Sequence, residues 1–173
     1  MIAITGHTSG IGHAIATWFA AREHPVRGFA ASTGYDLAQS GTIERIIDDA
    51  QTADVFINNA YHAMAQVDLL YALYERWAAD ASKTILSISS NSGDGTKNYP
   101  HPYAVYKTAL DKTIEQLQNT RPACRIMNLR PGYVDTHRVS YVQAQKLAPS
   151  YVAEVVGWMV QQPGLIKTLT VEP

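Results

Sequence analysis

Short apolar runs alternate with segments of helical periodicity along the whole chain. Six runs rich in Ile, Val, Leu or Phe have the length of strands buried on both faces: 2–5, 26–30, 54–58, 84–89, 125–129 and 167–171. Between them lie five segments with apolar side chains at helical spacing: 10–22, 41–51, 66–80, 103–118 and 150–161. This alternation predicts an α/β fold, a three-layer, doubly wound parallel sheet with helices on both faces.

Two polar segments that contain glycine, 31–41 and 91–102, are predicted loops. In a doubly wound sheet, loops at the carboxyl ends of the strands are where ligands bind. No repeat or long linker interrupts the pattern, and 173 residues leave room for one domain. We therefore predict a single Rossmann-type domain over 1–173. Its last helix is expected to have Ser150 as the N-cap.

Composition narrows the possible partners. The formal net charge is −1 and no block of basic residues occurs, which argues against nucleic acid or an anionic membrane as a partner. We expect no membrane span, because no run of 18 or more apolar residues occurs. We also expect no signal peptide, because the residues MIAITG lead directly into a predicted strand. The single cysteine, Cys124, cannot form an internal disulfide, and the histidines lack metal-ligand spacing. A cytoplasmic protein without a metal site is therefore expected.

A glycine-rich loop, TGHTSGIG at residues 5–12, follows the first predicted strand and opens the first helix. This context is typical of a loop that holds the pyrophosphate of a dinucleotide, because a helix N-terminus offers free N–H groups and partial positive charge. Gly6 allows the tight turn, Gly10 a close approach to the phosphates, and Gly12 close packing of helix and strand. The alternative is a plain turn between strand and helix, which rarely needs three glycines.

Tyr103 and Lys107 are four residues apart on a predicted helix and therefore share a face. A tyrosine in water has a pKa of about 10, and a nearby ammonium group favours the phenolate and lowers that pKa. The pair is thus a candidate for acid–base chemistry. Tyr106 is adjacent to the lysine and is expected to point elsewhere. The alternative is an exposed tyrosine–lysine pair, which is common on helices.

Five motifs occur in the order and at the intervals of the classical short-chain dehydrogenase/reductase family, which the chain resembles from residue 2 to about 136. They are TGHTSGIG (5–12), DVFINNA (54–60), ILSISS (85–90), YAVYK (103–107) and RPGYVDT (130–136). The resemblance implies an NAD(P)-dependent oxidoreductase that interconverts a carbonyl and an alcohol by hydride transfer. It also implies a small-molecule substrate.

The family's catalytic roles fall on three residues of this chain. By resemblance, Tyr103 is the general acid/base, Lys107 binds the nicotinamide ribose and tunes Tyr103, and Ser90 polarises the substrate carbonyl. Three neighbouring serines compete with Ser90, and the spacing to Tyr103 selects Ser90. By the same resemblance, the cofactor-binding residues are Gly6, Thr8, Ser9, Gly10, Ile11, Gly12, Ser32, Asp36, Asn59, Ala60, Tyr103, Lys107, Pro131, Gly132, Val134 and Thr136.

The chain also departs from the family. The edge strand and crossover helix that usually follow the second strand are missing, and Asp36 then resembles the acidic residue that contacts adenine. Tyr61 stands where the family has glycine after Asn-Asn-Ala. The asparagine that the family often uses in a proton relay is missing, and Gln66 and His62 are the nearest polar candidates. The segment that covers the substrate after Thr136 is short.

Cofactor choice depends on the end of the second strand. An acidic residue there accepts a hydrogen bond from the 2′-hydroxyl of NAD. This chain has Ala30, Ala31, Ser32 and Thr33 instead. No carboxylate repels a 2′-phosphate, and the two small hydroxyl groups are able to donate to it. The sequence favours NADP, with NAD as the alternative.

The helix expected at 66–80 has apolar side chains on most of its circumference, whereas a surface helix needs only one apolar stripe. A homodimer or homotetramer is one explanation, since the family commonly dimerises through this helix and the one that bears Tyr103. Burial in the core of the same chain is the other.

Two other functions compete with the oxidoreductase. A non-catalytic, dinucleotide-binding regulator that retains the fold is the alternative, and the missing asparagine leaves room for it. A nucleotide-sugar epimerase or dehydratase of related fold is disfavoured by the glycine spacing and by the lack of room for a substrate domain.

Overall fold

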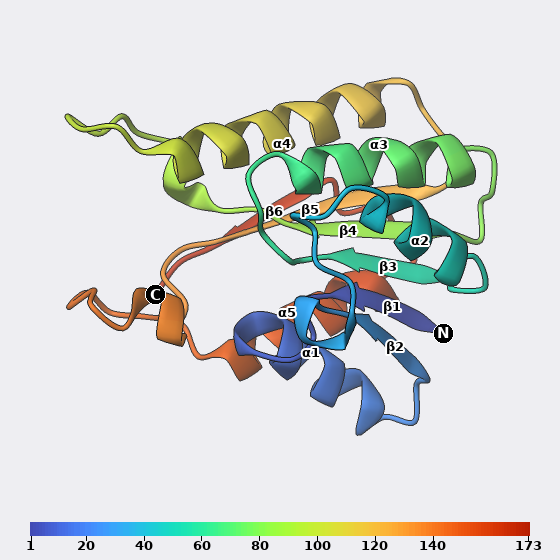
Figure 1. Ribbon diagram of the computed structural model, residues 1–173, viewed down its shortest axis with the longest axis horizontal. Coiled ribbons are helices and arrows are strands. Elements are labelled where there is room, and N and C mark those ends of the chain that lie inside the picture. The colour runs from blue at the N-terminus through green and yellow to red at the C-terminus, as the bar shows by residue number, and fades with distance from the viewer.

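The six strands of the computed structural model, which describes residues 1–173, lie parallel in one sheet (Figure 1). In the chain they are β1 (Ile2–Thr5), β2 (Val26–Phe29), β3 (Val55–Asn58), β4 (Thr84–Ile88), β5 (Arg125–Pro131) and β6 (Thr168–Val171). The helices are α1 (Gly10–Ala20), α2 (Thr42–Asp49), α3 (Ala65–Trp77), α4 (Pro102–Asn119) and α5 (Pro149–Gln161), with short 3-10 turns at Ala31–Thr33, Asn91–Gly93 and His137–Val139. Every strand and helix predicted from the periodicity is present.

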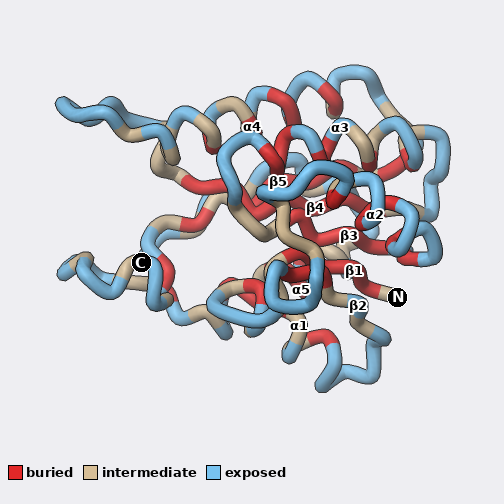
Figure 2. Tube along the Cα trace, viewed as in Figure 1, coloured by how far each residue is buried: buried red, intermediate tan, exposed pale blue.

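Helices cover both faces of the sheet. Successive strand residues alternate between the faces: Ala3 and Phe56 pack with α2, α3 and α4, whereas Ile4 and Ile57 pack with α1 and α5. Figures 1 and 2 show the resulting layers, with the buried positions concentrated along the sheet and the inner sides of the helices. The predicted three-layer α/β fold is confirmed.

The sheet, in the order β2-β1-β3-β4-β5-β6, ends at β2 on one side and β6 on the other. α2 is the one α-helix between β2 and β3, and no further strand lies beyond β2 at this edge of the sheet. The additional edge strand and crossover helix, which the sequence analysis expected to be missing, are therefore missing from the fold. β1, β3 and β4 are buried along their whole length, but β2 and β6 are partly exposed. The prediction of strands buried on both faces is therefore wrong for these two, because an edge strand has a neighbour on one side only.

The prediction that Ser150 caps α5 is also wrong. Ala148 occupies the N-cap position and Pro149 begins the helix. Proline is well suited to this first position because its fixed φ is helical and its missing N–H has no partner to lose there.

The apolar circumference of α3 is explained by the core of the same chain. Val67, Leu69, Leu70, Leu73 and Trp77 are all buried against the sheet and the neighbouring helices. These side chains therefore require no second subunit. Cys124, the single cysteine, is buried. No helix combines the length and the apolar character needed to cross a membrane.

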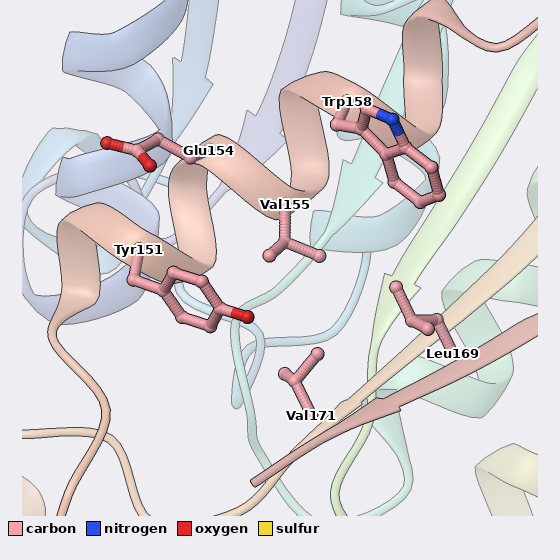
Figure 3. Close-up of a pocket in the computed structure, with 6 residues that line it drawn as sticks. All are labelled: Tyr151, Glu154, Val155, Trp158, Leu169 and Val171. Atoms are coloured by element: carbon pink, nitrogen blue, oxygen red, sulfur yellow. The ribbon is translucent and has the colours of Figure 1, made fainter. Parts of the chain in front are cut away.

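A shallow apolar groove lies between α5 and β6, the edge strand of the sheet farthest from β2 (Figure 3). Tyr151, Val155 and Trp158 of α5 face Leu169 and Val171 of β6 across it. Trp158 is 50% exposed and Tyr151 is 44% exposed. These exposed aromatic side chains form an apolar patch on the surface of the chain. The homodimer or homotetramer stays a prediction.

All strands run in the same direction, so their carboxyl ends lie in a row along one side of the sheet, on the left of Figure 1. This side is called the carboxyl edge. The loops after β1, β3, β4 and β5 emerge at this edge, and α1 and α4 begin there. This arrangement brings together motifs that are far apart in the sequence.

Candidate active site

The loop after β1 needs its glycines for two different reasons. Gly6 has φ of 72° and Gly10 has φ of 52°, in the left-handed region that other residues adopt at a cost. A Cβ atom on Gly12 would lie 2.2 Å from the carbonyl oxygen of Gly6 and 2.6 Å from Nδ2 of Asn59. The turn therefore brings the start of α1 against the ends of β1 and β3 at a distance that only glycine allows.

The N-terminus of α1 is suited to a phosphate group. Ser9, the N-cap residue, makes no side-chain hydrogen bond to the helix, and the first turn contains no acidic residue. The N–H groups and the positive end of the helix dipole are therefore not neutralised by the chain itself. Thr136 approaches from the loop after β5, with its Cγ2 atom 3.2 Å from the position of a Cβ on Gly10. The residues present fit the pyrophosphate of a dinucleotide.

Asn59 and Ala60 connect the ends of β3 and β1. Nδ2 of Asn59 donates to the carbonyl oxygen of Thr5 at 2.9 Å, and the backbone N–H groups of Asn59 and Ala60 both donate to Oγ1 of Thr5 at 2.9 Å. The Asn59 amide thus holds two strand ends together beside the glycine loop. This is compatible with a neighbouring ribose, because the Asn59 oxygen is left free by these bonds.

The end of β2 presents two hydroxyl groups side by side. Oγ of Ser32 donates to Oγ1 of Thr8 at 3.3 Å, and both side chains are exposed. The nearest acidic residue in the sequence, Asp36, accepts a hydrogen bond from the N–H of Ala38 in its own loop. Arg27 is paired with Asp49 at 3.5 Å and does not join the two hydroxyl groups. Ser32 thus contacts the glycine loop at Thr8, and no carboxylate contacts either hydroxyl group.

Ser90 and Tyr103 meet at the carboxyl end of β4. Ser89 faces α4, where its hydroxyl donates to the carbonyl oxygen of Lys107 at 3.5 Å. Ser90 points away from it, accepts a hydrogen bond from the N–H of Ser92 at 3.1 Å, and lies close enough to the Tyr103 hydroxyl to lower its pKa. Strand alternation therefore directs Ser90, and not Ser89, toward the tyrosine.

Lys107 is buried beside Tyr103, one turn further along α4. Its Nζ lies 5.6 Å from the centroid of the Tyr103 ring and donates to Oε1 of Gln66 at 2.6 Å and to the carbonyl oxygen of Ile88 at 2.8 Å. Gln66, which is 3% exposed, also donates to the carbonyl oxygen of Asn58 at 2.8 Å. Gln66 and His62 were the two polar candidates for the role of the proton-relay asparagine. Gln66 contacts Lys107, whereas His62 is exposed and makes no side-chain hydrogen bond.

Burial determines the ionisation of this pair. Loss of solvation lowers the pKa of Lys107 to about 7. Burial likewise raises the pKa of Tyr103, although Ser90 and the charge of Arg138 oppose the shift. The expectation that Lys107 lowers the pKa of Tyr103 is therefore wrong for this structure, since desolvation outweighs the neighbouring charges and the Lys107 ammonium is directed at Gln66 and Ile88.

The depressed lysine pKa predicts a pH-dependent stability. Unfolded Lys107 has a pKa near 10.5 and binds a proton more tightly than the folded residue, whose pKa is about 7. The unfolded state therefore carries more protons between these values, and the free energy of unfolding should rise from about pH 7 to 9. The Lys107→Met variant should lack this component of the rise. Urea denaturation of both proteins at several pH values measures it, and identical pH profiles would contradict the buried lysine.

Tyr61, which follows Asn59 and Ala60, packs directly on Tyr103. The two ring centroids are 4.9 Å apart in an edge-to-face arrangement, and Tyr106 lies 6.4 Å from Tyr61 on the other side. The expectation that Tyr106 points elsewhere is therefore wrong, because residues three apart on a helix also share a face. The guanidinium carbon of Arg138 lies 5.4 Å from the Tyr61 ring centroid. Sequence reasoning missed Arg138, which belongs to no motif.

The loop after β5 completes this edge. Gly132 follows Pro131 and donates its N–H to the carbonyl oxygen of Val171 at 2.8 Å. Val134 is buried and pairs with Leu147 in an isolated parallel bridge, in which the hydrogen bonds are made by Tyr133 and Asp135. The N–H and carbonyl groups of Val134 itself are left free by this bridge. They lie two residues from Thr136, so both polar functions needed to bind a carboxamide are available on this segment.

Solved structures of short-chain dehydrogenases share this fold over nearly the whole chain. A short-chain dehydrogenase/reductase from Vibrio parahaemolyticus has a TM-score of 0.81 at 17% identity, with 99% of each chain covered. A 3-ketoacyl-(acyl-carrier-protein) reductase from Brucella melitensis, complexed with NADH, also has a TM-score of 0.81 at 17% identity, covering 99% of this chain and 96% of that one. An alcohol dehydrogenase from Thermococcus sibiricus, complexed with 5-hydroxy-NADP, has a TM-score of 0.75 at 18% identity, covering 98% and 95%.

No family model and no curated protein matches the sequence. The likeness therefore lies in the three-dimensional structure, and at these identities it establishes the fold.

Proposed function

We propose that this chain, with the short-chain dehydrogenase/reductase fold from end to end, is a shortened member of that family and an NAD(P)-dependent oxidoreductase that interconverts a carbonyl and an alcohol. One observation carries the proposal. Ser90, Tyr103 and Lys107 converge at the sheet edge where the glycine loop opens α1. A phosphate-binding loop beside a buried tyrosine–lysine pair is the arrangement that hydride transfer to a carbonyl requires.

Each catalytic side chain has a distinct role. A bound nicotinamide dinucleotide supplies the hydride for reduction and accepts it in the reverse reaction. The Ser90 hydroxyl donates a hydrogen bond to the carbonyl oxygen, which polarises the C=O bond. The Tyr103 hydroxyl gives its proton to that oxygen as it becomes the alcohol oxygen, and takes it back in oxidation. Lys107 is able to exchange protons near neutral pH, because its pKa is about 7.

The remaining site residues follow the cofactor from end to end. Gly6, Gly10 and Gly12, with the N–H and hydroxyl groups of Thr8, Ser9 and Ile11, are proposed to hold the pyrophosphate. Ser32 and Asp36 would lie at the adenosine, and Asn59 and Ala60 at its ribose. Tyr103 and Lys107 would contact the nicotinamide ribose. The segment formed by Pro131, Gly132, Val134 and Thr136 would bind the carboxamide.

The adjacent hydroxyl groups of Ser32 and Thr8 support NADP as the preferred cofactor. Both are able to donate to a 2′-phosphate, and no carboxylate contacts them. We expect NADPH to bind more tightly than NADH. Ser32→Asp should weaken NADPH binding at least about tenfold and leave NADH binding nearly unchanged, since a carboxylate repels the phosphate but accepts the 2′-hydroxyl.

Fluorescence titration of both nucleotides measures this preference. Thr52→Asp is the matched control, because it adds the same charge to an exposed loop at the opposite edge of the sheet. Equal NADPH and NADH affinities in the unaltered protein would contradict the assignment of NADP and leave NAD as the cofactor.

The alternative, a non-catalytic regulator that binds the dinucleotide, is favoured by one observation. The Tyr61 ring packs edge-to-face on Tyr103, and the guanidinium carbon of Arg138 lies 5.4 Å from the Tyr61 ring centroid. A regulator would bind NADPH with wild-type Ser90, Tyr103 and Lys107 yet reduce no carbonyl compound. Assays of a carbonyl panel with NADPH and NADH therefore separate the two functions.

A further inference from the structure

Arg138 lies close to the proposed reaction centre. It lies in the turn His137–Val139, directly after Thr136. Its guanidinium carbon is 5.4 Å from the Tyr61 ring centroid, and that ring is 4.9 Å from the ring of Tyr103. A single aromatic side chain therefore separates the guanidinium from the tyrosine that is proposed to protonate the substrate.

The charge of Arg138 is not neutralised within the chain. It forms no salt bridge and no hydrogen bond, and its side chain is exposed. The carboxylates of the adjoining segments are engaged elsewhere: Asp135 with Lys146 at 3.8 Å, Glu172 with Asn91 at 2.8 Å, and Asp94 with Arg130. The guanidinium donors of Arg138 thus remain available to a ligand.

The side chains beside Arg138 are aromatic. Tyr61, Tyr103, Tyr106 and His101 form a continuous set of rings, with His101 6.1 Å from Tyr103. The charge of Arg138 lowers the pKa of both Tyr103 and Lys107, whereas Asp111 raises the pKa of Lys107. An unpaired cation therefore lies beside these rings, although the whole chain has a net charge of −1.

We propose that the substrate is a carbonyl compound with an anionic group near the carbonyl, and that Arg138 is the specificity-determining residue that binds this group. The inference rests on the proposed function. A planar guanidinium matches the two oxygens of a carboxylate and also accepts a phosphate. A neutral substrate leaves the guanidinium unpaired, so the anionic compound gains binding energy that its neutral analogue lacks.

Matched pairs of compounds test the proposal. Pyruvate and acetoacetate are compared with their methyl esters, and dihydroxyacetone phosphate with dihydroxyacetone, each with NADPH. For the preferred pair, kcat/KM of the anion should exceed that of the neutral analogue at least about tenfold. A preference within the pyruvate or acetoacetate pair indicates that the site binds a carboxylate, and a preference within the dihydroxyacetone pair indicates a phosphate. Arg138→Gln should abolish the preference, mainly by raising KM for the anion.

Arg76→Gln is the matched control, because it removes the same charge from an exposed arginine on α3 that is paired with Asp48. The control should retain the preference for the anion. An equal or better kcat/KM for the neutral compounds would overturn the proposal while leaving the oxidoreductase function intact. Weaker NADPH binding by Arg138→Gln, with the anion preference unchanged, would also overturn it, since Arg138 would then bind the cofactor.

A binding measurement keeps the two proposals separable. Titration calorimetry of the Tyr103→Phe protein saturated with NADPH compares each anion with its neutral analogue. If an anion binds to Tyr103→Phe and this binding is lost in the double variant Tyr103→Phe/Arg138→Gln, the anion site is supported. This holds even if the unaltered protein turns over none of the compounds, a result that would refute only the oxidoreductase function. Equal binding of anion and neutral analogue would refute the anion site.

Discussion

Tyr103→Phe is expected to lower kcat about a thousandfold for any carbonyl compound that the unaltered protein reduces. The substitution removes the one hydroxyl group that the geometry offers as proton donor, and general acid catalysis contributes roughly a hundred- to ten-thousandfold. NADPH binding should survive, because the phenylalanine ring keeps its edge-to-face contact with Tyr61 at 4.9 Å. Steady-state rates and a fluorescence titration of NADPH measure the two effects separately.

Tyr106→Phe is the matched control for this experiment. Tyr106 lies one turn further along α4 and its ring is 6.4 Å from that of Tyr61, but its hydroxyl forms no hydrogen bond with Ser90 or Lys107. Its variant should retain kcat within a few-fold. If Tyr103→Phe retained comparable activity, the proton would have to come from another group, and the assignment of Tyr103 as general acid would be wrong.

Gly12→Ala should impair both folding and cofactor binding. The added Cβ would lie 2.2 Å from the Gly6 carbonyl oxygen and 2.8 Å from its carbon, so backbone and not a flexible side chain must move. Overpacking of this kind typically costs about 1–3 kcal/mol, and we expect a loss of about 3 kcal/mol in the free energy of unfolding. The displaced loop should also weaken NADPH binding about a hundredfold.

Gly164→Ala provides the comparison, because a Cβ at that position meets nothing within 4 Å and the residue lies in the loop after α5. Urea denaturation and NADPH titration of the two variants measure the difference. A Gly12→Ala protein as stable and as tightly binding as Gly164→Ala would show that the loop tolerates the side chain.

Periodicity alone determined the elements and their layers. The strands β1, β3 and β4 are fully buried and therefore read as continuous apolar runs, while each helix has one buried side and reads with helical spacing. The short connection between β2 and β3 likewise required the loss of an edge strand. The exposure of β2 and β6 was beyond this reasoning, because an apolar run does not record how many neighbours a strand has.

The sequence also determined which chemical groups reach the candidate site. Parallel strands deliver their carboxyl ends to one edge, so Gly12, Ser90 and Tyr103 had to meet once the fold was known. The spacing of Tyr103 and Lys107 placed both on one face of α4. These inferences depend on local geometry and strand direction, which the residue pattern encodes.

Only the tertiary structure decided what surrounds those groups. It selected Gln66 over His62 as the partner of Lys107 and turned the expected fall in the Tyr103 pKa into a rise. It also packed Tyr61 against Tyr103 and placed Arg138 beside Tyr61. It also buried the apolar side chains of α3 within the chain. The physical reason is the same in each case: desolvation and contacts between distant segments depend on three-dimensional packing, which spacing along the chain does not record.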